Sequence, residues 1–402
     1  MSDRRPVRVL VVIGTRPEAI KMAPVVLALR HLPAFHTTLC LSGQHGTLAR
    51  EALAAFGLRP DERLDVVRCR DDLFELTAMV VHRLGGLIDR LRPDRIIVHG
   101  DTCTALAAAM AGHLAGVPVA HVEAGLRTGD PTSPWPEEGN RRAIATWADL
   151  HFAPTARARR HLLAEAVAAD RIEVTGNTGI DAVRLAQHRL ATDAGLRRGV
   201  TAALPPQRGR RLVLATAHRR ENFGAAHKAL ADGLMRLASL PDVAVWFVRH
   251  PNPSAAAAFA GLEQGRAGVV VLPPQPYFAF VQLLIRSDVV VTDSGGVQEE
   301  AAALERSAVV VRGHTERPEA VAFGSARLVP PVGPEICAAA CYMLCGDGRA
   351  KAVGGAGLFG DGAAAGRIAR RLAREHGVPV HRSAPADGDR DPALLAPAIP
   401  TD

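Results

Sequence analysis

Carboxylates follow two apolar runs near the middle of the chain, and a third acid opens the helical pattern after them. Asp101 lies in HGDT after the run 95–98, and Glu123 lies in HVEAG after the run 117–120. Glu137 follows the segment PWP. If both runs are parallel strands, their carboxyl ends meet at one edge of a sheet, where α/β proteins bind ligands. We therefore predict an acid/base cluster of Asp101 and Glu123, with Glu137 and Glu138 opening the helix that follows.

Each acid taken alone also has a structural explanation. Asp101 stands where a helix N-cap residue is favoured, and Glu137 with Glu138 would complement the dipole of the helix that they open. Three acids at adjacent strand ends favour the functional interpretation, because groups with perturbed ionisation gather at functional sites.

The loop after the first apolar run combines a helix start with two cations. Residues 14–21 read GTRPEAIK, and Thr15 and Glu18 have the spacing of a capping box. Amides at a helix N-terminus bind anions, and Arg16 and Lys21 would lie beside them. We predict an anion site here. The alternative for Lys21 is an exposed, solubilising lysine.

A second helix start follows the apolar run 288–293. Gly295 and Gly296 would let the backbone approach a ligand, and with Ser294 they precede or open a helix over 296–304. Amides at this helix start would hold a phosphate.

Other polar residues of the second half suit the same role. Glu299 or Glu300 would accept hydroxyl groups of a sugar or ribose, with dipole compensation as the alternative. Arg317 precedes a helix-starting proline and suits a second anion contact. His218 and His250 stand at the ends of two further apolar runs.

Short apolar runs alternate with helical patterns along both halves of the chain. This alternation predicts parallel strands joined by crossover helices, and thus a doubly wound α/β sheet in each half. We expect helices at 71–91 and 105–115, a linker at 191–210 and a closing helix at 364–376. The predicted strands are 7–13, 37–42, 95–98, 117–120, 150–153 and 172–175 in the first half, and 212–218, 243–250, 268–274, 288–293 and 308–313 in the second.

Composition excludes several classes of protein. A chain of 402 residues is long enough for two domains, and 48% hydrophobic with 22% charged residues is ordinary for a soluble globular protein. Arginine carries most of the net charge of +7, without long basic runs, and only 4% of residues are aromatic. We expect no nucleic-acid partner, because a basic pocket for a small anion explains the charge as well. The apolar run 7–13 is too short to span a membrane.

The six cysteines contain no CxxC pair and fit a reduced, cytosolic chain. Cys337, Cys341 and Cys345 recur every fourth residue and so share one helix face. A site of three thiolates binding a metal is conceivable, but we interpret them as small buried hydrophobes and predict no metal centre.

Two motif matches lack the context that they require. Residues 355–360 match G-x-G-x-x-G, but no predicted strand precedes them. Residues 292–296 resemble the active-site segment of serine proteases, whose all-β fold conflicts with the α/β pattern here.

The ordered motifs GTRPEAIK, GQH, HGDT, HVEAGLRTGD, PWPEEGNR, AHRRENFG, DSGGVQEEA and TERPEA resemble those of the non-hydrolysing UDP-N-acetylglucosamine 2-epimerases, over about residues 7–376. The resemblance implies two Rossmann-like doubly wound domains facing across a cleft, the glycosyltransferase-B type. Their expected bounds are 1–190 for the domain with the carboxylates and 191–363 for the UDP-binding domain. The closing helix 364–376 would pack back on the first, and a tail from about 378 would be disordered.

The resemblance also implies roles for individual residues. Asp101, Glu123, Glu137 and His218 would be catalytic. The residues facing the sugar-diphosphate or UDP would be Arg16, Lys21, Arg141, His250, Phe280, Ser294, Gly295, Gly296, Glu300 and Arg317. Phe280 would pack on the uracil ring, although a core aromatic is its default interpretation.

The implied reaction interconverts UDP-GlcNAc and UDP-ManNAc without a metal or nicotinamide cofactor, in a cytoplasmic homodimer. Anti elimination of UDP gives a 2-acetamidoglucal, and UDP adds again after protonation of the other face. Carboxylates would move the proton and cations would stabilise the leaving diphosphate. Three alternatives stay open: a hydrolysing relative that releases ManNAc and UDP, an epimerase for a further modified UDP-2-acetamido sugar, and a glycosyltransferase of the same fold.

A regulatory site is also implied, at which UDP-GlcNAc activates the enzyme. Gln44, His45 and the neighbourhood of Arg70 match part of it. Gly46 and Thr47 replace larger polar residues of the family, so we predict weak activation.

Overall fold

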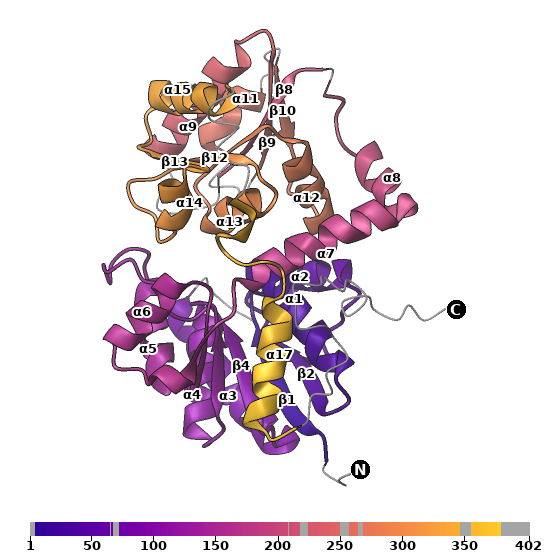
Figure 1. The fold of residues 1–402 in the computed structure, drawn as a ribbon, viewed down its shortest axis with the longest axis vertical. Helices are drawn as coiled ribbons and strands as arrows, with labels where there is room; N and C mark the ends of the chain where they lie inside the picture. The colour runs from indigo at the N-terminus through magenta and orange to yellow at the C-terminus, as the bar shows by residue number, and fades with distance from the viewer. Residues whose placement is uncertain are drawn as a thin grey trace. The chain divides into compact units, whose positions relative to one another are not determined.

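The structure is a computed structural model of the whole chain. It describes residues 5–64, 66, 72–207, 209–217, 224–249, 257–263, 268–345 and 355–378. The chain divides into two compact units, residues 1–185 with 360–402 and residues 186–359 (Figure 1). His218, His250 and Arg70 lie outside the described residues, as does the predicted tail beyond residue 378.

The first unit is built on a parallel sheet of seven strands in the order β3-β2-β1-β4-β5-β6-β7. The order reverses between β1 and β4, and such a switch point opens a crevice beyond the carboxyl ends of the strands. Its elements are β1 (Val7–Ile13), α1 (Arg16–His31), β2 (Phe35–Leu41), α2 (Gly46–Ala55), β3 (Glu62–Arg63), α3 (Leu73–Leu91), β4 (Arg95–His99), α4 (Cys103–Leu114), β5 (Val119–Val122), α5 (Glu137–Trp147), β6 (Leu150–Ala153), α6 (Ala156–Ala164), η1 (Ala169–Arg171), β7 (Ile172–Val174) and α17 (Ala364–Glu375).

Helices cover both faces of this sheet, which explains why its strands are apolar without alternation. On one face, Leu10 and Ile96 belong to a core cluster with Leu84 of α3 and Ala108 of α4. On the other face, α1 contacts β1 and β2 and packs against α17. The burial of α17 against α1 uses an apolar stripe formed by Ala365, Ile368, Ala369, Leu372 and Ala373.

The second unit repeats the design with six parallel strands in the order β10-β9-β8-β11-β12-β13, so its switch point lies between β8 and β11. Helix α7 (Thr178–Thr192) begins in the first unit and ends in the second. The remaining elements are α8 (Ala194–Ala202), β8 (Arg211–Thr216), α9 (Ala225–Ala238), β9 (Val243–Val248), η3 (Ala257–Phe259), α11 (Ala260–Glu263), β10 (Val269–Leu272), α12 (Tyr277–Arg286), β11 (Val289–Thr292), α13 (Gly295–Ala303), β12 (Ser307–Val311), α14 (Pro318–Phe323), β13 (Ala326–Val329), α15 (Gly333–Leu344) and η4 (Gly355–Gly357).

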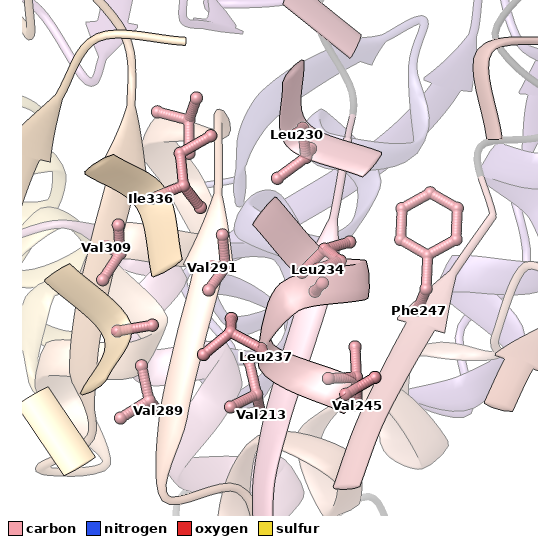
Figure 2. Packing of buried hydrophobic residues seen from close by; sticks show 14 of the residues in the cluster. Val213, Leu230, Leu234, Leu237, Val245, Phe247, Val289, Val291, Val309 and Ile336 are labelled. Carbon is pink, nitrogen blue, oxygen red and sulfur yellow. The ribbon is translucent and has the colours of Figure 1, made fainter. Parts of the chain in front are cut away.

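The core of the second unit lies between its sheet and helices α9 and α15. Figure 2 shows Val213, Val245 and Val291 on neighbouring strands beside Leu234 and Leu237 of α9. The intervening Trp246 is buried on the opposite face, where the guanidinium carbon of Arg286 in α12 lies 4.9 Å from the Trp246 ring centroid. Both faces of this sheet are therefore covered as well.

The fold class is confirmed, with corrections in detail. Strands β3 and β13 were not predicted, because two and four residues respectively give too short an apolar pattern. The predicted linker 191–210 contains helix α8, whose polar and exposed residues hid its periodicity. Cys337 and Cys341 pack against the core cluster of the second unit, whereas Cys345 follows α15 and is exposed.

Within the described residues, no helix combines the length and hydropathy needed to cross a bilayer. Those residues also contain no group of three or more His, Cys, Asp or Glu side chains placed to hold a metal ion.

Candidate active site

The loops after β1 and β4 meet at the switch point of the first sheet. Gly14 follows β1, and a Cβ atom there would lie 2.1 Å from Thr104 Oγ1 and 2.7 Å from Ser42 Oγ. The hydroxyls of Ser42 and Thr104 are themselves 2.8 Å apart. Only glycine fits at position 14, so the two loops are packed together beyond the strand ends.

The predicted capping box begins α1, with Thr15 as its N-cap. Glu18 Oε2 accepts hydrogen bonds from the Thr15 amide at 2.7 Å and the Gly14 amide at 3.1 Å, and Oε1 accepts one from the Thr102 hydroxyl at 2.9 Å. Burial raises the pKa of Glu18 to about 7, against the opposing effect of these donors. A carboxyl group of the chain itself thus occupies the Gly14 and Thr15 amides just before the helix, and anion binding at this helix start stays a prediction.

Glu123 directly follows β5 and is one of few described non-glycine residues with a positive φ, at 64°. Its side chain is buried, forms an ion pair with Lys21, and accepts a hydrogen bond from Asn177 Nδ2 at 2.7 Å. His99 Nε2 lies 3.9 Å from the same oxygen, Oε2. A non-glycine residue held in this backbone region costs free energy of the order of 1 kcal/mol or more, which points to a functional constraint.

Asp101 is held from helix α5. Arg141 donates to Asp101 Oδ2 from Nε at 2.8 Å and approaches it with Nη2 at 2.6 Å, while Asn140 Nδ2 donates to the Asp101 carbonyl at 2.8 Å. Arg141 is 5% exposed and was expected to face the sugar-diphosphate. In the structure its guanidinium orients Asp101, and its contact with a sugar-diphosphate stays a prediction.

The structure separates the two acids that begin α5. Glu138 is fully buried and accepts hydrogen bonds from the Thr128 amide at 3.1 Å and from Arg141 at 3.2 Å. Glu137 is partly exposed, and its charge acts on Cys103 at the start of α4. Glu138 therefore fixes the preceding loop, and Glu137 lies toward the helix that follows Asp101.

Three buried histidines lie on the neighbouring strands β4, β5 and β6. Burial lowers the pKa of His121 to about 3 and the pKa values of His99 and His151 to about 4, so all three are neutral at pH 7. The Nε2 of His121 lies 2.7 Å from the Gly100 carbonyl, which only accepts, so this nitrogen carries the proton. His121 thereby supports the turn between β4 and Asp101.

The second switch point has a different chemistry. The hydroxyls of Thr216 and Thr292, at the ends of β8 and β11, are 2.7 Å apart. Ser294 is the N-cap of α13 as its sequence predicts, and Gly295 and Gly296 form the first turn. The backbone of this turn lies at the strand ends, where a phosphate group would meet the positive end of the helix dipole.

Gly295 lies directly against the guanidinium group of Arg317. A Cβ atom at position 295 would lie 2.3 Å from Arg317 Nη1. Arg317 is 5% exposed and pairs with Glu299 and, at 2.7 Å, with Glu316. The guanidinium that we predict to contact an anion of the ligand thus already binds two carboxylates of the chain.

Two other predicted nucleotide contacts surround this helix. Glu300 is partly exposed and accepts a hydrogen bond from the Tyr277 hydroxyl at 3.2 Å, so it is the acid of the pair that stays accessible. Phe280 in α12 is 9% exposed, which the core interpretation explains equally well.

Four further residues of the first unit lie at the ends of its strands or at the starts of its helices. Arg16 begins α1 and is partly exposed. Gln44 Oε1 accepts a hydrogen bond from Thr104 at 2.8 Å, and His45 is the N-cap of α2. Asn177 is the contact of Glu123 that sequence reasoning missed. Its only signal was the position after strand β7, at a strand end like the other site residues.

Two doubly wound parallel sheets, one with acids and one with a serine-capped helix start at the carboxyl ends of the strands, are the architecture of the glycosyltransferase-B fold class. A solved spinosyn rhamnosyltransferase, SpnG, shares this fold with a TM-score of 0.57 at 16% identity, covering 90% of this chain and 100% of that one. The family model for UDP-N-acetylglucosamine 2-epimerase matches residues 27–373, and the chain belongs to that family.

Individual relatives agree with this assignment. A probable UDP-N-acetylglucosamine 2-epimerase of Ralstonia solanacearum is 43% identical over 368 residues, 91% of this chain and 98% of its own. The UDP-N-acetylglucosamine 2-epimerase of Escherichia coli K12 is 38% identical over the same shares. The crystal structure of UDP-GlcNAc 2-epimerase from Neisseria meningitidis bound to UDP-GlcNAc has a TM-score of 0.88 at 36% identity, covering 92% of this chain and all of that one.

The contact between Gly295 and Arg317 predicts different outcomes for two adjacent glycines. Gly295→Ala should destabilise the protein by about 1–3 kcal/mol, because Arg317 must leave its two carboxylates. Gly296→Ala is the matched control: its Cβ would find Ser294 Oγ at 3.9 Å, and we expect a change within about 0.5 kcal/mol. Denaturant unfolding of both variants tests this, and equal stabilities would contradict it.

The neutral state of His121 predicts a pH effect. Its pKa is lowered from 6.5 to about 3 on folding, so its contribution is present above pH 6.5 and is lost as the pH falls toward 3. At pH 5 the wild type should have lost about 2 kcal/mol through this histidine relative to pH 7.5. His121→Gln should be less stable at pH 7.5 but should show a correspondingly smaller loss on acidification. Parallel stability–pH curves for the two proteins would disprove the effect.

Proposed function

We propose that this protein interconverts UDP-GlcNAc and UDP-ManNAc by inverting the sugar at C2. The observation that carries the proposal is the placement of Glu123, buried and ion-paired with Lys21, at the same switch point as Asp101. Carboxylates fixed by cations at the carboxyl ends of neighbouring strands suit proton transfer at a carbon atom. Family membership supplies the substrate class.

The reaction begins with elimination. One carboxylate takes the C2 proton, the C1–O bond to UDP breaks, and the electron pair of the C–H bond forms the C1–C2 double bond of a 2-acetamidoglucal. UDP leaves with the electron pair of the C1–O bond. A second acid returns a proton to the opposite face of C2, and UDP adds again at C1. Proton transfer by positioned acids accounts for about 10²–10⁴-fold of the rate.

We assign proton transfer to Asp101, Glu123 and Glu137 of the first unit, and nucleotide binding to the second. The turn at Ser294, supported by Arg317, would take phosphate oxygens. Glu300 would accept ribose hydroxyls, and Phe280 would pack on uracil.

The remaining assignments follow the resemblance. Arg16 would contact the sugar-diphosphate, as would His218, stabilising the negative charge of departing UDP. His250 would contact UDP. We also propose a cytoplasmic homodimer. Phe74 at the start of α3 and Leu114 at the end of α4 are exposed apolar side chains of the kind that interfaces cover. Sedimentation equilibrium at twice the chain mass would support the dimer.

Proton NMR in deuterated water tests the reaction directly. The purified protein is incubated with UDP-GlcNAc, and the recovered nucleotide sugars are examined for deuterium at C2. Deuterium at C2 with appearance of UDP-ManNAc supports the proposal. Release of free ManNAc would indicate the hydrolysing reaction instead, and the absence of both exchange and free sugar would defeat the proposed function.

The different surroundings of Glu137 and Glu138 give a sharp test of the acid roles. Asp101→Asn, Glu123→Gln and Glu137→Gln should each lower kcat about a hundredfold or more while the fold is retained. Glu138→Gln should instead reduce thermal stability, because it loosens the loop at residues 128–129. Initial rates and melting curves for all four variants distinguish the roles. Near-wild-type turnover in two of the first three would remove the cluster.

Activation by UDP-GlcNAc should be weak. The Thr47 hydroxyl already accepts a hydrogen bond from Arg50 at 3.3 Å, and Gly46 offers no side chain. Loss of a hydrogen bond to a charged ligand costs about 1.5–3 kcal/mol, which weakens binding more than tenfold. Starting from pure UDP-ManNAc, we expect turnover without a lag. A long lag abolished by micromolar UDP-GlcNAc would show an intact regulatory site.

A further inference from the structure

Asn177 contacts the Glu123 carboxylate from the start of α7. It is 2% exposed, and its Nδ2 donates to Glu123 Oε2 at 2.7 Å. Its Oδ1 accepts a hydrogen bond from the Gly179 amide at 2.8 Å. Because the carbonyl side of the amide is engaged by a backbone donor, the NH₂ side is fixed toward Glu123. The orientation of Asn177 therefore does not depend on Glu123 itself.

The two oxygens of Glu123 have different surroundings. Oε2 is held by both Lys21 and Asn177. Oε1 lies 3.8 Å from the point where a Cβ atom of Gly100 would stand, on the turn that leads to Asp101. The ion pair with Lys21 and the hydrogen bond from Asn177 thus anchor the carboxylate through Oε2.

Asn177 also lies where the chain crosses between its two units. It precedes α7, through which the chain leaves the first unit, and the chain returns to that unit at Gly360. A Cβ atom at Gly360 would lie 3.2 Å from the Asn177 nitrogen. One turn into α7, Asp181 accepts hydrogen bonds from the Ala364 and Ala365 amides at 3.2 and 2.8 Å. The backbone of Asn177 is thus packed beneath the returning segment.

We propose that Asn177 is a positioning residue for Glu123: it fixes the carboxylate for proton transfer and ties it to the segments through which the chain enters and leaves the first unit. This role rests on the proposed epimerisation. Lys21 supplies the charge that balances Glu123, whereas Asn177 supplies direction, since an amide hydrogen bond is more directional than an ion pair.

Two substitutions at position 177 test the role. Asn177→Ala should lower kcat about ten- to a hundredfold with little change in KM. The variant lacks a hydrogen bond that positions the Glu123 carboxylate for the chemical step and that does not contribute to substrate binding. Donation to a carboxylate favours its ionised form, so losing the donor should move the acid limb of the pH–rate profile to higher pH. Asn177→Asp should move it further, because a second negative charge faces Glu123. Titratable groups beside Glu123 include Lys21 and His99, and Asp101 acts on the same histidine.

Asp181→Asn is the control. Asp181 lies on the helix that Asn177 precedes, and it holds the returning segment through the Ala364 and Ala365 amides. We expect it to lower the melting temperature and to leave the acid limb of the pH–rate profile unchanged. If both Asn177 variants behave like Asp181→Asn, Asn177 is only structural and the proposal fails.

A measurement without turnover separates this proposal from the reaction itself. Carbon NMR of protein labelled at glutamate carboxyl groups follows the titration of Glu123, whose signal is assigned by its loss in Glu123→Gln. The midpoint should move to higher pH in Asn177→Ala. An unchanged midpoint would overturn the proposal even if epimerisation is confirmed. A wild type that exchanges no deuterium would defeat the reaction but not the positioning.

Discussion

The ion pair of Lys21 and Glu123 is the constraint on which the first unit depends. Both side chains are nearly buried, at 13% and 8% exposure, and leaving one of two buried charges alone typically costs about 3–5 kcal/mol. Lys21 comes from the second turn of α1 and Glu123 from the end of β5. The pair therefore forms only if the loops after β1, β4 and β5 meet at one edge, which the strand order 2-1-4-5 provides.

The surrounding polar groups can be understood as consequences of that pair. Asn177 donates a second hydrogen bond to Oε2 of Glu123. His99 lies near the same oxygen and is neutral, so it does not add a second positive charge. Arg141 does for Asp101 what Lys21 does for Glu123. Glu123 and Asp101 are thus each held by a cation from a different helix, which offsets the repulsion between their two negative charges.

Much of this could be read from the sequence, and the limits have a physical cause. The alternation of apolar runs with helical segments predicted both sheets, because parallel strands that are covered on both faces appear in the sequence as continuous apolar runs. The positions of Asp101 and Glu123 followed from the strand ends. The sequence did not predict which cation pairs with which acid. Lys21 and Glu123 are 102 residues apart, and no periodic sequence pattern indicates where the side chains of loop residues point.

Near neighbours were as hard to tell apart as distant ones. Glu137 and Glu138 both suit a helix start, and only packing shows that Glu138 is buried beneath the loop at 128–129. Glu299 and Glu300 differ in the same way, through Arg317. Motif resemblance named the ligand-facing residues as a set, but it could not indicate that Arg141 and Arg317 are both buried among carboxylates.

The carboxyl group of Glu18 at the start of α1 has a consequence for how an anion could bind there. Helix starts at strand ends usually attract phosphate, yet here an internal carboxyl group already accepts hydrogen bonds from the Gly14 and Thr15 amides. An anion at this end of the first unit would therefore depend on the mobile tips of side chains such as Arg16, and less on the fixed backbone of the loop.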